Sequence, residues 1–238
     1  MSDMFYWPAI DLIIWGLTSS YFSSLQGGNQ QVISILLGSL LLWMVVWRSQ
    51  YEISVNLLED LWNKNLMNIF VAPLSFYEWI AAFYTLGIVK SIVSISFAAI
   101  LAFVLYHTNF LQYNIVFVLY LPILIMFGWT LGMMISALVL RFGTRVQTLA
   151  WSFPYLVSPF AAIYYPIATL PPFARKIASI IPISYVFESG REYVSKGVVD
   201  YHSLVVALMM SVVLLILATI FLKKSFDKLL QKGLVSVY

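Results

Sequence analysis

Long apolar runs separated by short polar turns dominate the pattern of the chain. Six of these runs approach the roughly twenty apolar residues that a helix needs to cross about 30 Å of hydrocarbon. They cover residues 5–22, 32–47, 76–106, 115–140, 148–169 and 204–222. No linker or separate soluble domain interrupts them. The pattern therefore predicts an all-α polytopic membrane protein with six transmembrane helices, in which residues 1–238 form a single domain.

Composition agrees with this class and narrows the chemistry. Hydrophobic residues make up 62% of the chain and charged residues only 10%, against roughly 25% charged in soluble domains. The absence of cysteine excludes disulfides and thiolate zinc sites. His107 and His202 are far apart, and no Gly-x-x-x-x-Gly-Lys-Ser/Thr phosphate loop occurs. We therefore expect no enzyme activity, no cofactor bound by this chain and no nucleic-acid partner.

The positions of lysine and arginine predict the orientation. With the N-terminus inside, the basic residues of the short loops fall in the cytosol, and the two short outer loops contain none. The cytosolic set is Arg48, Lys64, Arg141, Arg145, Lys223, Lys224, Lys228 and Lys232. The chain is thus expected to be a multi-pass protein of the cytoplasmic membrane, surrounded by membrane lipid, with both termini cytoplasmic.

The connection after the second run is amphipathic. Within residues 54–70, apolar and charged side chains fall on opposite faces at helical spacing, which is typical of a helix that lies in the membrane interface. The apolar face includes Leu58, Leu61 and Trp62, and the polar face includes Glu59, Asp60 and Lys64. Taken alone, this segment is interpreted by default as a surface helix that has no partner.

Prolines divide the stretch between the last two runs. Pro166, Pro171 and Pro182 limit helix continuation, so residues 170–197 are expected to form two short amphipathic helices, over residues 173–181 and 184–195. Such helices at the outer mouth suggest a re-entrant segment, which a bilayer tolerates only where protein or water covers the backbone.

These two stretches resemble the permease subunits of type-2 ABC exporters. The last loop of that family carries a proline, a Leu-Pro pair, a basic short helix, a Pro-Ile-Ser-Tyr motif and an arginine shortly before a glycine. The matching positions are Pro166, Leu170-Pro171, Arg175, Pro182-Ile183-Ser184-Tyr185, Arg191 and Gly197. After its second span the family carries a Leu-Glu-x-Leu helix and then Pro-Leu-Ser, with a glutamate three residues on. The matching positions are Leu58-Glu59-Asp60-Leu61, Pro73-Leu74-Ser75 and Glu78.

The resemblance implies a type-2 ABC exporter permease fold with a separate motor. Two ATP-binding subunits, which bind ATP and Mg, would dock on the cytoplasmic side, and a second copy or a related permease would complete the membrane part. Docking would involve Leu58, Glu59, Asp60, Leu61, Trp62 and Lys64, and an outer gate would involve Pro166, Pro171, Pro182, Tyr185 and Arg191. The exported substrate would be a lipid-linked glycan, a lipid or an amphipathic drug.

The chain departs from this family in two respects. It has no basic amphipathic helix before the first run, and Phe83 stands where the family has lysine. The alternatives are a membrane-embedded lipid-modifying enzyme, a passive channel or an assembly factor.

Two ionisable residues, Asp11 and Lys90, lie clearly within predicted spans, where charge is costly and often functional. They could form an ion pair that steadies an inner gate, with Arg141 as another partner for Asp11, or they could both lie near the inner interface. Gly128 and Gly132 form a Gly-x-x-x-Gly pattern that predicts close helix packing within the chain.

Local features of the fourth and fifth spans suggest flexibility and a conduit. Pro154 and Pro159 are expected to kink the fifth span. An aromatic set could line a conduit or simply fill the packing between helices: Trp129, Trp151, Phe153, Tyr155 and Tyr164.

Overall fold

Four long helices carry the architecture of the protein. The computed structural model describes residues 3–25, 27, 30–65, 75–108 and 114–232. The long helices are α2 (Gln30–Trp62), α4 (Phe76–Tyr106), α5 (Asn114–Phe142) and α9 (Tyr201–Lys232). Each contains a stretch that is long and apolar enough to cross a membrane. Within the described residues, the predicted all-α, membrane-like character is confirmed, with four such helices in place of six.

Shorter helices occupy the rest of the described chain. They are α1 (Asp3–Leu25), η2 (Gly143–Val146), α6 (Leu149–Val157), η3 (Ser158–Phe160), η4 (Ile167–Thr169), α7 (Pro172–Ala178) and α8 (Pro182–Lys196). The first predicted span, residues 5–22, lies within α1, although α1 is not among the four helices that meet both the length and the hydropathy required for crossing.

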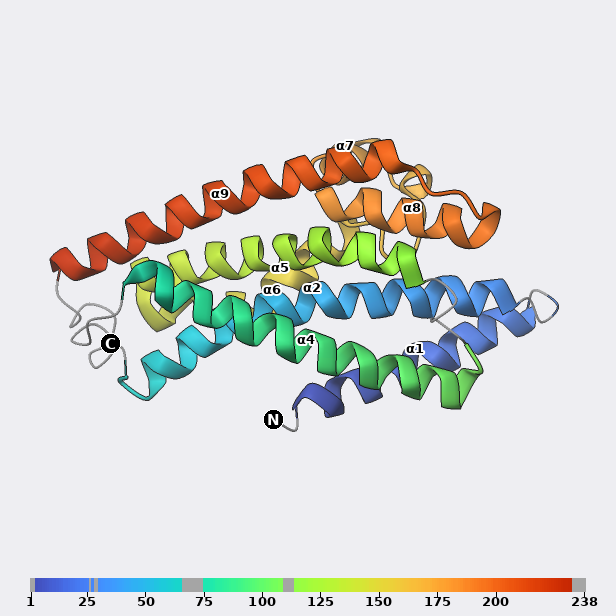
Figure 1. Cartoon of the computed structure of the whole chain (residues 1–238), viewed down its shortest axis with the longest axis horizontal. Helices are drawn as coiled ribbons and strands as arrows, with labels where there is room; N and C mark the ends of the chain where they lie inside the picture. The colour runs from blue at the N-terminus through green and yellow to red at the C-terminus, as the bar shows by residue number, and fades with distance from the viewer. Residues whose placement is uncertain (1–2, 26, 28–29, 66–74, 109–113, 233–238) are drawn as a thin grey trace.

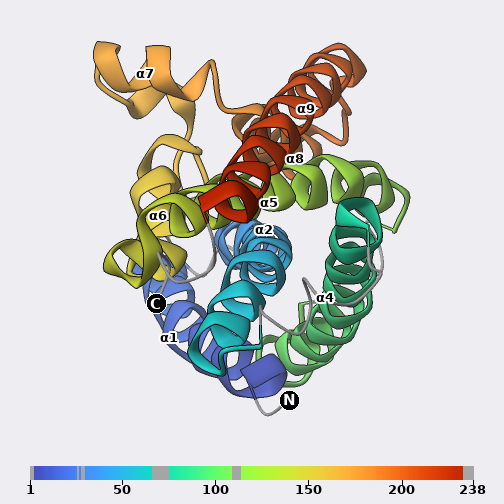
Figure 2. The ribbon, with the colours of Figure 1, turned by 90° about the vertical axis from the view of Figure 1, so that its left-hand side faces the viewer.

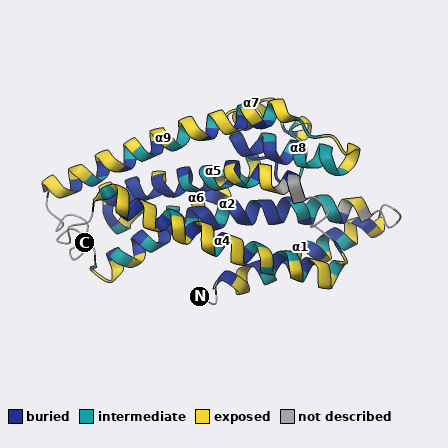
Figure 3. Ribbon diagram, viewed as in Figure 1, coloured by how far each residue is buried: buried dark blue, intermediate teal, exposed yellow. Residues whose placement is uncertain are grey.

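The centre of the bundle is α2, with α1, α4 and α5 around it and α9 outside α5 (Figures 1 and 2). In the apolar windows of α2 and α5, 72% of the residues are buried, against 22% in α4 and α9. The outer faces of α4 and α9 are therefore exposed (Figure 3) and apolar, with Ile100 and Leu217 more than half exposed. Exposed apolar surface on this scale suits lipid and not water.

The helix of the second predicted span does not end near residue 47, because α2 continues to Trp62. No glycine or proline occurs between Ser39 and Lys64 to stop the helix. The polar side chains that suggested an exit from the membrane, Arg48 to Ser54, turn inward and are buried. Residues 54–62 are thus the last turns of α2 and not a separate interfacial helix; residues 66–70 of the predicted segment lie outside the described residues.

Two glycines set the distance between α2 and α5. A Cβ atom at Gly128 would lie 2.6 Å from the carbonyl oxygen of Val46, and one at Gly132 would lie 2.9 Å from that of Gln50. Both distances are too short for a side chain, so the helices approach to backbone contact. The prediction that the Gly-x-x-x-Gly pattern packs within the chain is confirmed.

The fifth predicted span is not one helix. α6 ends at Val157, with Pro154 inside it, and η3 begins with Pro159 at its second position. The nine residues of α6 rise roughly 14 Å at 1.5 Å per residue, which is less than half of the bilayer core. The two prolines therefore break this segment where the sequence predicted only a kink, and residues 148–169 do not form a spanning helix.

Candidate functional site

The proline-rich stretch of residues 166–197 folds into the two short helices that the sequence predicted. α7 and α8 correspond to the two expected short helices, and prolines mark their starts: Pro171 precedes α7 and Pro182 is the first residue of α8. Pro166 likewise precedes η4. The Ser184 hydroxyl donates to the Ala178 carbonyl at 2.7 Å, which joins the two helices across their turn. Tyr185 adds a second link, because its hydroxyl donates to the Ser179 carbonyl at 3.0 Å.

Arg191 ties α8 to the loop that follows η3. Its Nη1 donates to the carbonyls of Ala162 at 2.7 Å and Ile163 at 3.3 Å, and its Nη2 lies 3.1 Å from Glu188 Oε2. Glu188 in turn accepts from the backbone N–H of Ile167 at 2.5 Å. Burial lowers the pKa of the Arg191 guanidinium, an effect that the Glu188 charge opposes. Because Ala162 has a positive φ of 55°, this arginine also stabilises a strained backbone turn.

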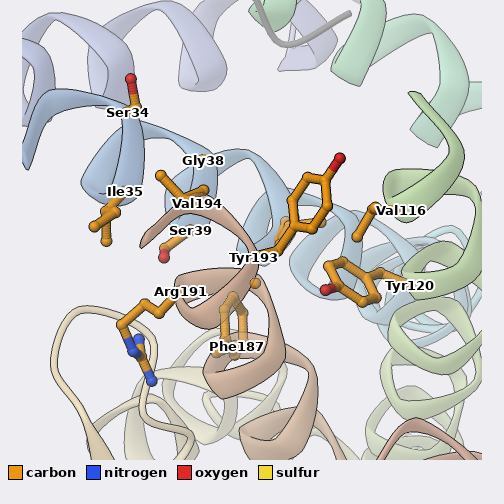
Figure 4. A pocket seen from close by; sticks show the side chains of 12 residues that line it. Ser34, Ile35, Gly38, Ser39, Val116, Tyr120, Phe187, Arg191, Tyr193 and Val194 are labelled. Carbon is orange, nitrogen blue, oxygen red and sulfur yellow. The ribbon is translucent and has the colours of Figure 1, made fainter. Parts of the chain in front are cut away.

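Arg191 also borders a small cavity between α2, α5 and α8 (Figure 4). The cavity volume is about 30 Å³, enough for water but far below the several hundred Å³ of a drug-sized site. The lining comes mostly from Ser34, Gly38, Ser39, Tyr120, Phe187 and Arg191. Of the predicted outer-gate positions, Pro182 is buried and Arg191 borders this cavity, whereas Pro166 and Pro171 are exposed. We call α8 and residues 161–167, which Arg191 joins, the cap.

Replacing Arg191 with methionine is expected to loosen this cap. The change removes two charge-assisted hydrogen bonds to carbonyls and leaves Glu188 without its cation, so the loss should be about 2 kcal/mol or more. Hydrogen exchange should become faster in α8 and in residues 161–167 and stay unchanged in α4. The control is Lys196→Met, which removes a pair whose lysine side chain is 64% exposed and which should have little effect. Equal protection in both variants would contradict this role of Arg191.

The predicted coupling residues lie at the C-terminal end of α2 but do not share one surface. Leu58 and Leu61 are 0% and 1% exposed and pack in the core with α4, α5 and α9. Glu59, Trp62 and Lys64 are exposed, and Asp60 is half-buried. Leu58 and Leu61 therefore do not contribute to the apolar docking face expected for this segment, because their side chains are buried in the core of the bundle.

An aromatic and polar contact joins the end of α2 to the turn between α5 and α6. The Trp62 ring stacks on Trp151 at 6.2 Å between centroids, and Trp62 Nε1 donates to Gln147 Oε1 at 3.0 Å. Lys64, with φ of 54°, and the Asp60–Asn65 side-chain hydrogen bond of 3.0 Å end the helix here. We call the exposed surface of Glu59, Trp62 and Lys64 the inner ledge, because the positions of the basic residues predict that this end of α2 faces the cytosol.

The Ser75 to Glu78 part of the resemblance has a local structural explanation. Ser75 Oγ accepts from the N–H of Glu78, and Glu78 Oε2 accepts from the N–H of Ser75 at 2.8 Å. This reciprocal pair is a capping box. It starts α4 at Phe76, as the sequence predicted. Pro73 and Leu74 lie outside the described residues.

A buried charge cluster in the middle of the bundle was not predicted. Glu52 is 0% exposed, and its two oxygens pair with Arg48 Nη2 at 2.9 Å and Lys90 Nζ at 2.6 Å. Asn56 Nδ2 also donates to Glu52 at 3.1 Å. Lys90 therefore pairs with Glu52. The hypothesised ion pair between Lys90 and Asp11 is not formed. Arg141, the other suggested partner of Asp11, donates to Ser225 at 2.8 Å.

This cluster lies deep in the bundle. Gly132 of α5 packs against the turn of α2 that contains Glu52. Arg141, in the last turn of α5, follows Gly132 by nine residues. At 1.5 Å per residue the cluster is roughly 13 Å from the basic C-terminal end of α5. The sequence signal was present, because Arg48 and Glu52 are spaced i, i+4. It was missed because Arg48 was placed in the cytosol.

The five aromatic residues suggested as a conduit do not gather in one place. Trp129 stacks on Tyr84 of α4 at 3.9 Å, and Trp151 stacks on Trp62. Tyr155 and Tyr164 instead lie toward α1 and α2, where they contact Trp47 and Trp15. Among the described residues, no group of three metal-binding side chains occurs.

Comparison with known proteins adds no family to this description. No protein-family model matches the chain, and no curated protein is significantly similar to it. The proposal that follows therefore depends on the arrangement of the helices and on the motif resemblance.

Proposed function

We propose that this chain is the membrane permease subunit of an ATP-driven exporter of the type-2 ABC class. In this proposal α1 and the broken segment of residues 148–169 join the four long helices in the membrane, which gives six membrane segments. Both termini face the cytosol. A second copy or a related permease pairs with this chain, and two separate subunits bind and hydrolyse ATP with Mg.

The observation that carries the proposal is the continuity of α2. One uninterrupted helix runs from the inner ledge to the outer cap, and α5 contacts it at backbone distance in the middle. At its outer half, Ser34, Gly38 and Ser39 face α8 across the small cavity. A subunit that displaces the ledge would therefore displace α2 as a rigid body and, with it, the packing of α8.

The motif resemblance supports this interpretation at both ends of α2. The Leu58 to Leu61 motif ends the helix at the ledge, and the Pro182 to Tyr185 motif begins the helix that closes the outer side. The ATP chemistry is assigned to the partner subunit because this sequence lacks a phosphate loop. The transported substrate is drawn from lipid-linked glycans, lipids and amphipathic drugs.

The test is whether an ATP-binding subunit docks on the inner ledge. The tagged chain is co-expressed with a candidate ATPase that carries Walker motifs, and the pair is purified in mild detergent. Glu59→Lys combined with Trp62→Ala should reduce recovery of the ATPase at least tenfold, because both side chains are exposed and Trp62 is a large contact residue. Leu61 is unsuitable for this test, since its replacement would disturb the core.

The matched control changes exposed charge at the opposite end of the molecule. Glu192→Lys in α8 also reverses an exposed acid and should leave ATPase recovery unchanged. Full recovery of the ATPase with the ledge variant, at unchanged thermal stability of the chain, would contradict docking at this surface.

A further inference from the structure

α5 and α9 run parallel, and their apolar runs end at the same level. The Thr219 hydroxyl of α9 donates to the sulfur of Met133 of α5 at 3.2 Å. Further along both helices, Arg141 Nε donates to the Ser225 hydroxyl at 2.8 Å. The two contacts advance in the same direction along both helices, which lie side by side in Figure 1. The surface that the helices share therefore continues from their apolar runs to their basic C-terminal parts.

Two stripes of residues meet at Arg141. Each stripe follows the i, i+4, i+7 spacing of one helix face. The Arg141 guanidinium carbon lies 4.6 Å from the centroid of the Phe221 ring, which places the two stripes next to each other. We call the seven residues of both stripes the α5–α9 surface. They are Met134, Leu138 and Arg141 on α5 and Leu217, Phe221, Lys224 and Lys228 on α9.

The α5–α9 surface is apolar in its first part and basic in its second. Met134 and Leu217 are exposed, and so are Arg141, Lys224 and Lys228. Met134 precedes Arg141 by seven residues, and Leu217 precedes Lys224 by seven. On both helices the apolar part is thus roughly 10 Å from the basic part along the axis. Basic residues that end an apolar run mark the headgroup region of a bilayer, so the apolar part lies among the acyl chains.

Arg141 is held in place and keeps donors for a ligand. Its Nε is bound to Ser225, which is buried, and its guanidinium packs on Phe221. Within the described part of the chain, no hydrogen bond or ion pair uses its two Nη groups, and such a fork of donors matches the oxygens of a phosphate. Asp227, the acid at this end of α9, offsets one of the three positive charges of Arg141, Lys224 and Lys228, which leaves an excess of two.

This combination is complementary to an anionic phospholipid. The phosphate fits the basic part, and the acyl chains continue into the apolar part. A soluble anion would leave Met134 and Leu217 uncovered. A zwitterionic lipid would bring an additional cation close to the two lysines, where like charges repel.

We propose that the α5–α9 surface is a binding site for one anionic phospholipid. Its phosphate group contacts Arg141, Lys224 and Lys228, and its acyl chains cover Met134 and Leu217. The site requires that α5 and α9 cross the membrane, and it does not rest on the permease function proposed above.

The experiment measures lipid binding to the full chain without an ATPase. Native mass spectrometry follows the chain in micelles that contain equal amounts of phosphatidylglycerol and phosphatidylcholine with identical acyl chains. The anionic lipid should bind about tenfold more tightly. A lysine near an anionic headgroup contributes about fivefold in affinity. Lys224→Gln combined with Lys228→Gln should therefore weaken binding of phosphatidylglycerol about 25-fold and leave binding of phosphatidylcholine unchanged.

Two controls separate this site from a general effect of charge. Lys176→Gln combined with Lys196→Gln removes the same charge from exposed positions on α7 and α8 and should have no effect. Lys223→Gln changes the residue next to Lys224, but its Nζ lies 3.4 Å from the Tyr77 hydroxyl of α4, on another face of α9. It should weaken binding less than about twofold, whereas Lys224→Gln alone should weaken it about fivefold.

Three results would overturn the site. They are equal binding of the two lipids, equal losses with Lys223→Gln and Lys224→Gln, and displacement of phosphatidylglycerol by inorganic phosphate, which would assign the cations to a soluble anion.

The lipid site and the permease proposal can fail separately. Unchanged lipid binding by the Lys224→Gln and Lys228→Gln variant, together with lost recovery of the ATPase, would overturn the lipid site and assign the two lysines to the motor. Lipid binding that this variant loses, in a chain that never recovers an ATPase, would support the lipid site and count against the permease alone.

Discussion

Glu52→Gln is expected to destabilise the protein more than any other single change considered for this chain. The carboxylate is completely buried and compensates two cations, Arg48 at 2.9 Å and Lys90 at 2.6 Å. Glutamine would remove the negative charge that both cations contact, and Arg48 is itself only 7% exposed. Breaking a buried ion pair by removing one partner costs about 3–5 kcal/mol. Chemical denaturation in detergent micelles should show a loss of that size or a failure to accumulate folded protein.

Two comparisons separate the ion cluster from a general effect of the substitution. Glu192→Gln removes an acid of the same type from an exposed pair with Lys196 and should change stability by less than about 1 kcal/mol. The triple variant Arg48→Met, Glu52→Gln and Lys90→Met removes the cations as well and should recover most of the loss, because no charge then remains buried without a partner. If Glu52→Gln were as stable as Glu192→Gln, the cluster would not be buried as described.

Gly128→Ala is expected to force α2 and α5 apart. Its Cβ would lie 2.6 Å from the Val46 carbonyl oxygen and 2.7 Å from Ser49 Cβ. A backbone atom cannot rotate away, so the whole helix must shift. Overpacking of this kind costs about 1–3 kcal/mol, which exceeds the roughly 1 kcal/mol that alanine gains over glycine in a helix. Thermal unfolding of the purified protein should report a clear net loss.

Gly87→Ala is the matched control, because it makes the same change in another long helix. Its Cβ would meet Trp129 Nε1 at 3.5 Å and Glu52 Cβ at 3.7 Å, both ordinary contacts. This variant should be neutral or more stable than the native chain by up to about 1 kcal/mol. The close approach of α2 and α5 would be refuted if both alanine variants behaved alike.

The starts of α4, α7 and α8 show where reasoning from the sequence succeeded. α4 spans Phe76–Tyr106, as predicted, because a capping box starts it and the apolar run ends with it. α7 and α8 begin beside their prolines for a comparably local reason. In each case the determining groups lie within a few residues of the boundary.

The interior of α2 shows where reasoning from the sequence failed. A run of polar residues from Arg48 to Ser54 was interpreted as leaving the membrane, yet the helix continues and buries them. Glu52 pairs with Lys90 on α4. Gln50 donates to the carbonyl of Ala150 on α6 at 3.1 Å. Neither partner is near in sequence, so no local pattern could identify them.

The sequence by itself determined the helical class, the membrane-like composition, most helix starts and the glycine pair that lets α2 and α5 touch. Only the tertiary structure decided which polar groups lie inside, that Lys90 pairs with Glu52, that Trp15 of α1 stacks on Tyr164, and that Trp47 of α2 contacts Tyr155 of α6. The physical reason is that hydropathy reports the solvation cost of each residue separately. The compensation of a buried charge depends on partners from other helices, and their positions exist only after the bundle has assembled.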